Sequence, residues 1–179
     1  MEIQSTEFKG LFLIAPNVYS DSRGYFFEKY NKKIFAEKSI TQDFLQESES
    51  FSYKNTLRGL HFQKKPFEQG KLVSVVQGSI KDVVVDIRKD SQNYGKWKAF
   101  LLDSKEKKSL FVPEGFAHGF LALEDSIVSY RITALYNKES ESGIIWNDSF
   151  LNINWGISNP ILSEKDKKLP IFNDLSNLI

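Results

Sequence analysis

Short hydrophobic runs separated by turn-forming residues dominate the pattern of this chain. They fall at residues 10–19, 24–30, 71–78, 79–89, 96–103, 109–115, 118–125 and 126–136. Runs of this length, bounded by Gly, Pro, Asn and Asp, are typical of β-sandwiches and barrels. Helix signals are few: residues 31–40 fit one amphipathic helix, and the segment SEKDKKL at 163–169 opens another. The pattern therefore predicts an all-β sandwich or barrel with a few short peripheral helices.

Alternation within two of the runs predicts which side chains face the interior. In SIKDVVVDIRK, Val83 and Val85 share a face that we expect to be core. In SIVSYRITALY, Val128, Tyr130 and Ile132 share one face, so Tyr130 should point inward. An inward tyrosine is often simply a core residue whose hydroxyl reaches a partner, and the strand pattern by itself favours that interpretation.

Composition limits the class of protein. A chain of 179 residues, 41% of them hydrophobic, predicts a single domain over residues 1–179, because no repeat or linker divides it. The 24 Lys and Arg residues nearly balance the 23 Asp and Glu residues, which argues against nucleic-acid or membrane partners. The absence of cysteine excludes disulfides, thiolate metal sites and cysteine nucleophiles. The first residues show no basic leader, and their apolar run is too short for a signal peptide, so we expect a cytoplasmic protein.

The chain has two histidines, and both lie in distinctive surroundings. His118 follows a tight turn made by Pro113 and Gly115, a spacing that resembles the second histidine segment of metal-binding cupin barrels. In the first segment, however, the partner of His61 is Gln63, where such barrels carry another histidine. Two imidazoles and an amide are a poor donor set for a transition metal, so no metal is expected. The alternative is that each histidine is an ordinary core or rim residue.

Seven segments, in order, resemble signatures of the dTDP-4-dehydrorhamnose 3,5-epimerase family. They are DSRGYFFEKYN, LRGLHFQ, QGKLVSVVQG, VVVDIRKDSQNYGKW, VPEGFAHGFLAL, GIIWND and PILSEKD. Together the matches run from about residue 10 to residue 166, nearly the whole chain. The resemblance implies a cupin-like jelly roll, usually a homodimer, that acts on a nucleotide-linked 4-keto-6-deoxyhexose without metal or organic cofactor.

The resemblance also implies catalytic roles. A ketone at C4 makes the hydrogens at C3 and C5 removable as protons, so the reaction needs a base, an acid on the opposite face and a partner for the enolate oxygen. By match to the family motifs, His61 is the base, Tyr130 the acid and Lys71 the partner of the enolate oxygen. Asp166 would orient His61, although it also fits the third position of a helix that begins at Ser163.

The same resemblance implies the residues that bind the substrate. They are Arg23, Glu28, Gln46, Arg58, His118, Tyr136, Glu141 and Lys165. The forked guanidinium groups suit diphosphate oxygens, although either arginine could instead form a surface ion pair. Tyr136 matches the aromatic residue that stacks on the thymine ring, and Asp82 is expected to line the cavity beside His118.

Departures from the family pattern concern the substrate rather than the chemistry. Many relatives read Gln-Asp-Asn where this chain has Gln46, Glu47 and Ser48, and they carry proline where Gly156 stands here.

The predicted function is epimerisation at C3, C5 or both, with dTDP-4-dehydro-6-deoxyglucose as the expected substrate and dTDP-4-dehydrorhamnose as the product. Two alternatives stay open: a metal-dependent cupin oxygenase or isomerase, and a non-catalytic sugar-binding barrel.

Overall fold

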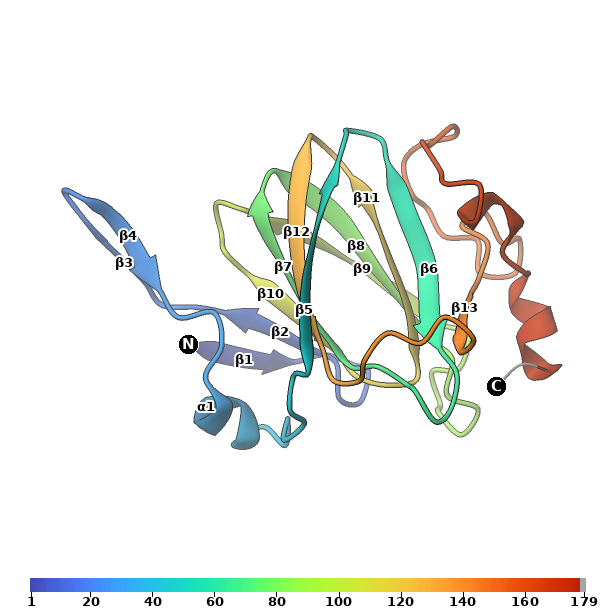
Figure 1. The fold of residues 1–179 in the computed structure, drawn as a ribbon, viewed down its shortest axis with the longest axis horizontal. Coiled ribbons are helices and arrows are strands. Elements are labelled where there is room, and N and C mark those ends of the chain that lie inside the picture. The colour runs from blue at the N-terminus through green and yellow to red at the C-terminus, as the bar shows by residue number, and fades with distance from the viewer. Residues whose placement is uncertain (178–179) are drawn as a thin grey trace.

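Two antiparallel sheets that face each other form the body of the molecule (Figure 1). The computed structural model describes residues 1–177. The six-stranded sheet has the spatial order β1 (Glu2–Ser5), β2 (Phe12–Ala15), β10 (Ser109–Val112), β7 (Lys71–Gln77), β12 (Ser126–Ile132) and β5 (Gln46–Ser52). The five-stranded sheet has the order β13 (Glu141–Gly143), β6 (Leu57–Gln63), β11 (Phe116–Ala122), β8 (Ser79–Asp86) and β9 (Trp97–Asp103). This arrangement confirms the expected all-β, cupin-like sandwich.

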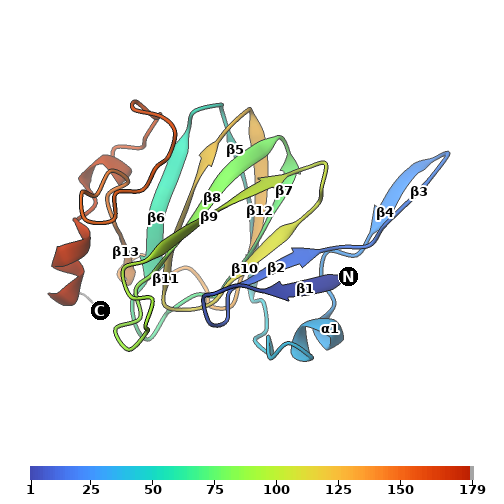
Figure 2. The same ribbon diagram turned by 180° about the vertical axis from the view of Figure 1, so that it is seen from behind.

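The helices are short and lie outside the sheets, as expected (Figure 2). The predicted helix at 31–40 is only α1 (Lys32–Ala36), capped by Asn31 and followed by Ser39 at a positive φ of 62°. The predicted second helix is shorter still, a 3-10 turn η1 (Asp166–Lys168), and a further 3-10 segment η2 (Phe172–Asn177) follows it. No helix within residues 1–177 is long and apolar enough to cross a membrane.

Hydrophobic side chains are buried on both sides of the five-stranded sheet. Between the sheets, Val84 packs with Val73, Leu110 and Val128. On the other side, Val83 and Val85 pack under the C-terminal segment, in a cluster that includes Trp155, Phe172 and Leu175. The prediction that Val83 and Val85 are core is therefore confirmed, but the neighbouring face of β8 is equally buried, and Asp82 and Asp86 on it are fully enclosed. Both faces are buried because the six-stranded sheet packs against the Val84 face, while the C-terminal segment covers the face of Val83 and Val85 (Figure 1).

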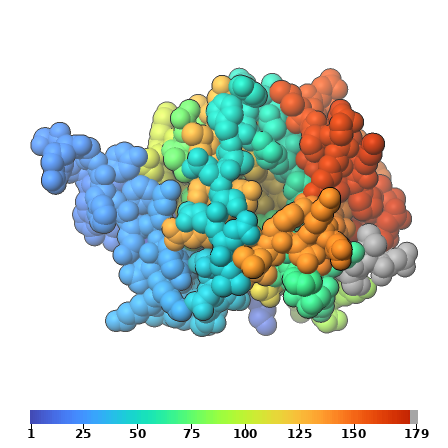
Figure 3. Space-filling view, in the orientation of Figure 1, coloured from blue at the N-terminus to red at the C-terminus, as the bar shows by residue number. Residues whose placement is uncertain are grey.

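A hairpin of β3 (Val18–Asp21) and β4 (Gly24–Phe27) projects from the body (Figure 3). Its aromatic side chains are largely in solvent: Tyr19 is 64%, Tyr25 59% and Phe26 71% exposed. Lys107 holds the hairpin to the body, since its Nζ donates a hydrogen bond of 2.9 Å to the Tyr25 hydroxyl and lies 4.2 Å from the ring centroid.

Candidate active site

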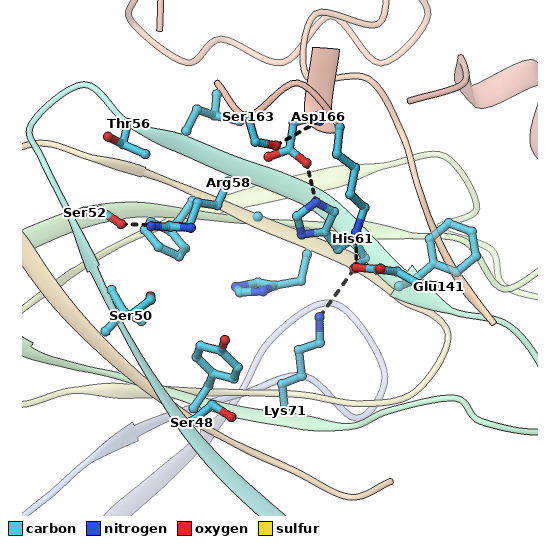
Figure 4. A pocket seen from close by; sticks show the side chains of 18 of the residues that line it. Ser48, Ser50, Ser52, Thr56, Arg58, His61, Lys71, Glu141, Ser163 and Asp166 are labelled. Atoms are coloured by element: carbon cyan, nitrogen blue, oxygen red, sulfur yellow. Dashed lines mark hydrogen bonds and ion pairs between the residues drawn. The ribbon is translucent and has the colours of Figure 1, made fainter. Parts of the chain in front are cut away.

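A cavity of about 630 Å³ opens between the two sheets. Its lining includes all but two of the predicted catalytic and substrate-binding residues. Figure 4 shows Arg58, His61, Lys71, Glu141 and Asp166 among them. Those that line it are Gln46, Arg58, His61, Lys71, His118, Tyr130, Tyr136, Glu141, Lys165 and Asp166.

Strand pairing places the two histidines side by side. His61 on β6 is the register partner of His118 on β11, and directly opposite residues of paired strands project to the same side of the sheet. The backbones approach closely at this point because of two glycines. A Cβ on Gly59, whose φ is +124°, would lie 2.5 Å from the Cα of Gly119, so a larger residue would force the strands apart.

Asp166 reaches His61 from the C-terminal segment. The His61 Nε2 lies 2.6 Å from the Asp166 Oδ1, across 105 residues of sequence. Because an ionised carboxylate only accepts hydrogen bonds, this contact places the hydrogen on Nε2 and leaves Nδ1 as an acceptor. Burial opposes ionisation of Asp166, but its interaction with His61 and its hydrogen bonds with Ser163 and the Gly59 backbone together lower the pKa of the carboxyl below its usual value. The helix-start interpretation also holds in part, since the Asp166 N–H donates to Ser163 Oγ at 3.1 Å.

The opposite wall carries Lys71 and Tyr130. Both come from the six-stranded sheet, Lys71 at the start of β7 and Tyr130 within β12. Val128, Tyr130 and Ile132 all line the cavity, which confirms the predicted inward face of this strand. Tyr130 also packs against the hydrophobic cluster between the sheets, so its inward position serves both the core and the cavity.

Burial of the Lys71 ammonium lowers its pKa to about 8, although the nearby carboxylates of Asp82 and Glu141 oppose the change. The Nζ also lies 3.5 Å from the backbone oxygen of His61, to which it donates a hydrogen bond. A lysine in this state carries its charge at neutral pH and loses it in mildly alkaline solution.

Asp82 lies behind His118 and does not line the cavity, contrary to expectation. It is fully buried, and its Oδ2 lies 2.8 Å from the His118 Nε2. The side chain points from β8 toward the neighbouring strand β11, so His118 separates it from the open space. Its charge still acts on the cavity through His118 and Lys71.

Polar side chains at the rim are bonded to one another. Glu141 pairs with the Lys165 ammonium and accepts a hydrogen bond of 2.8 Å from the Tyr136 hydroxyl. Burial raises the pKa of Glu141, but these partners outweigh burial and lower it overall. Arg58 donates from Nε to Ser52 Oγ and from Nη2 to the Phe51 carbonyl, both at 2.9 Å. The Arg58 guanidinium is therefore oriented by neutral groups of β5.

Arg23 and Glu28 are the predicted residues that the structure does not bring to the cavity. Arg23 lies at the tip of the projecting hairpin, where its side chain is 87% exposed and pairs with Asp21 at 2.6 Å. Glu28 follows β4 and is also exposed. A single chain therefore does not gather these two with the other site residues, because the hairpin extends away from the sheets (Figure 3).

The prediction missed a row of serines on β5. Ser48, Ser50 and Ser52 line the cavity at every second position. The period of two in QESESFS was the available signal, but the segment has only one hydrophobic residue and did not qualify as a strand. Because β5 is an edge strand beside a polar cavity, its inward face is made of small polar side chains rather than apolar ones.

Within residues 1–177, no three His, Cys, Asp or Glu side chains are grouped closely enough to hold a metal ion. The metal-dependent alternative therefore has no protein donor set in the described part of the chain.

Comparison with known proteins identifies the family of this chain. A family model described as dTDP-4-dehydrorhamnose 3,5-epimerase matches residues 5–174. The enzyme of that name from Methanothermobacter thermautotrophicus is 48% identical, over 90% of this chain and 89% of that protein. The one from Escherichia coli K12 is 41% identical, over 99% of this chain and 98% of that protein. A crystal structure of a Legionella pneumophila epimerase in complex with dTDP-4-keto-L-rhamnose has a TM-score of 0.94 at 38% identity, covering 99% of this chain and 96% of that one. With a family model spanning almost all of its length and relatives this similar, the chain belongs to the dTDP-4-dehydrorhamnose 3,5-epimerase family of isomerases.

Proposed function

We propose that this chain converts dTDP-4-dehydro-6-deoxyglucose to dTDP-4-dehydrorhamnose by inverting C3 and C5 through enolate intermediates. The observation that carries the proposal is the placement of His61 and Tyr130 on opposite walls of one cavity, with Lys71 beside them. Inversion needs proton removal on one face of the sugar and proton delivery on the other, so two walls are required. The ligand of the Legionella relative, dTDP-4-keto-L-rhamnose, supports the choice of substrate class.

Each catalytic group has a defined role in this proposal. The His61 Nδ1 removes the proton next to the ketone, and Asp166 stabilises the imidazolium that forms. The electron pair of the broken C–H bond moves onto the carbonyl oxygen, where Lys71, with His118 nearby, donates hydrogen bonds to the enolate. Tyr130 then delivers a proton to the opposite face. Proton exchange with solvent restores His61 and Tyr130 for the second carbon.

The rim supplies groups for the nucleotide. Arg58 has a guanidinium oriented for diphosphate oxygens, and Tyr136 presents an exposed ring on which the thymine can stack. Gln46 and Glu141 bond Tyr136, Lys165 pairs with Glu141, and all three line the cavity and complete the proposed binding surface.

The direct test is a panel of 4-keto-6-deoxy sugars on different nucleotides, incubated with enzyme in deuterated water and followed by proton NMR. We expect deuterium at C3 and C5 with inversion of the dTDP sugar. Deuterium and inversion at one carbon only would restrict the reaction to that carbon. Binding of the sugar with no exchange at either carbon would support the sugar-binding barrel instead, and a stoichiometric metal held by His61 and His118 would support the metal-dependent alternative.

Turnover should fall as the pH rises through about 8, the pKa to which burial lowers Lys71. Below this pH the protonated amine stabilises the enolate, and above it the neutral amine does so less well. The guanidinium of Lys71→Arg keeps its charge, so the fall in turnover on the alkaline side of the pH profile, its alkaline limb, should move to higher pH.

Lys71→Met should lower kcat on the order of 10²- to 10³-fold while dTDP affinity changes little, since enolate charge exists only after proton removal. An unchanged alkaline limb in Lys71→Arg, or weaker dTDP binding with unchanged kcat in Lys71→Met, would contradict this role.

We further propose that the enzyme is a homodimer in which the β3–β4 hairpin packs on the second subunit. The exposed rings of Tyr19, Tyr25 and Phe26 support this, because a projecting aromatic ribbon is rarely left in water. Arg23 and Glu28 would then serve the cavity of the other subunit. In sedimentation equilibrium we expect the mass of two chains, and a reduced mass for Phe26→Asp. A parent chain with the mass of one chain at assay concentrations would overturn the proposal.

The remaining proposals concern domain organisation and compartment. A core shared by both sheets supports one domain over residues 1–179, for which a single cooperative unfolding transition is the test. A chain without cysteine is compatible with the reducing cytoplasm, and cell fractionation would test that location.

A further inference from the structure

Gln63 occupies the end of β6, two residues after His61, and is only 5% exposed. Its side-chain amide forms three hydrogen bonds, all to backbone groups. The Nε2 donates to the Phe67 carbonyl at 2.6 Å and to the Leu135 carbonyl at 3.3 Å. The Oε1 accepts from the Asn137 N–H at 2.6 Å. The amide therefore bonds the residues immediately before and after Tyr136.

The Tyr136 hydroxyl donates a hydrogen bond of 2.8 Å to Glu141, whereas Gln63 holds the backbone of the segment that contains Tyr136, residues 133–137. This segment follows β12 and crosses the surface below the cavity, drawn in orange in Figures 1 and 3. Leu135 is 59% and Tyr136 53% exposed, so hydrophobic packing does not fix either residue. Side-chain hydrogen bonds from Gln69 and Gln46 add to those of Gln63, but each bonds a single backbone group, at Ala134 and Tyr136 respectively.

Only a primary amide of this length can make the three bonds. A carboxylate at position 63 would keep an acceptor for the Asn137 N–H but would lose both donors to the carbonyls. An apolar side chain would leave all three backbone groups without their Gln63 partner. Position 63 also belongs to the strand that carries His61, so the amide connects the backbone around Tyr136 to the strand that holds the proposed base.

We propose that Gln63 is a positioning residue, which holds Tyr136 in place for the nucleotide before the substrate arrives. The inference rests on the proposed role of Tyr136 in stacking against the base. A backbone segment that is already ordered loses less conformational entropy when the ligand binds, so its anchors contribute to affinity without touching the ligand. Loss of Gln63 should therefore weaken nucleotide binding more than it slows the chemistry.

The first test compares dTDP affinity and steady-state kinetics of Gln63→Met and Gln63→Glu with the parent. Both variants preserve side-chain length, and both lose the two donated bonds. We expect the dTDP Kd and the KM to rise on the order of tenfold, with kcat at saturation within about threefold of the parent. The matched control is Gln77→Met, an exposed glutamine at the end of β7, which should bind and turn over like the parent. If the Met variant does not fold, as judged by circular dichroism, the polar Glu variant carries the test.

A double-mutant cycle with Tyr136→Ala separates positioning from general support of the fold. If Gln63 acts through Tyr136, its substitution should change dTDP affinity by less than about twofold once the ring is absent. Additive losses, or a fall in kcat without a change in Kd, would overturn the proposal for Gln63. Equal dTDP binding by Tyr136→Ala and the parent would instead remove the proposed role of Tyr136, so the two failures are distinguishable.

Discussion

His61→Asn is expected to abolish both epimerisation and hydrogen exchange at the sugar carbons. An amide of similar reach cannot accept a proton at neutral pH, so the enolate never forms. General acid–base groups contribute on the order of 10²- to 10⁴-fold to rate, and the loss should fall in this range or beyond it. The measurement is proton NMR of the dTDP sugar in deuterated water, which records exchange and inversion in the same sample.

The control for this variant is binding. The substitution removes neither Arg58 nor the ring of Tyr136, so dTDP should bind to His61→Asn within a few-fold of the parent affinity. Deuterium uptake at the parent rate by a folded His61→Asn enzyme would show that another group removes the proton.

Tyr130→Phe is expected to separate exchange from inversion. His61, Asp166 and Lys71 are all retained, so the proton should still be removed and the enolate should still form. The proton donor on the opposite wall is gone, so protonated His61 can only return a proton to the face from which it was taken. The His61 side chain is 29% exposed, so its imidazolium can exchange with solvent before the return. Deuterium should therefore enter the sugar while the original configuration is kept.

The same variant tests the alternative that Tyr130 is only a core residue. On that interpretation Tyr130→Phe loses one hydroxyl, at a cost of about 0.5–1.5 kcal/mol of stability, and epimerises normally. Exchange without inversion, in a variant whose melting temperature is close to that of the parent, would establish Tyr130 as the acid. Inversion at the parent rate would place the acid elsewhere.

Local patterns predicted much of this molecule. Short hydrophobic runs between turn residues identified most strands, and period-two alternation identified the inward face of β12, because both patterns are local properties of the chain. The pattern failed on β5, whose inward side chains are serines facing a polar cavity, and it overestimated the helix that α1 replaces. Hydrophobicity reports burial against apolar neighbours, so a strand beside a polar cavity is difficult to recognise.

Family motifs indicated which residue types take part, but they did not show how the residues meet. Ten of the predicted site residues come together in one cavity, whereas Arg23 and Glu28 lie on or next to a hairpin that leaves it. The motifs could not reveal this difference, since the path of a hairpin relative to the sheets depends on packing rather than on its own sequence. The second subunit proposed above is the partner that would give the hairpin its place.

The sequence by itself determined the all-β class, the absence of cysteine chemistry and the small set of histidine, lysine, tyrosine and aspartate side chains available for catalysis. Tertiary structure decided that His61 pairs in register with His118, that Asp166 meets His61 across 105 residues, and that Asp82 lies behind the cavity wall. It also decided that the Gln63 amide bonds the backbone on both sides of Tyr136. Periodicity and composition are local properties of a chain, whereas register and long-range contacts depend on the free energy of the whole packed arrangement, which no single segment contains.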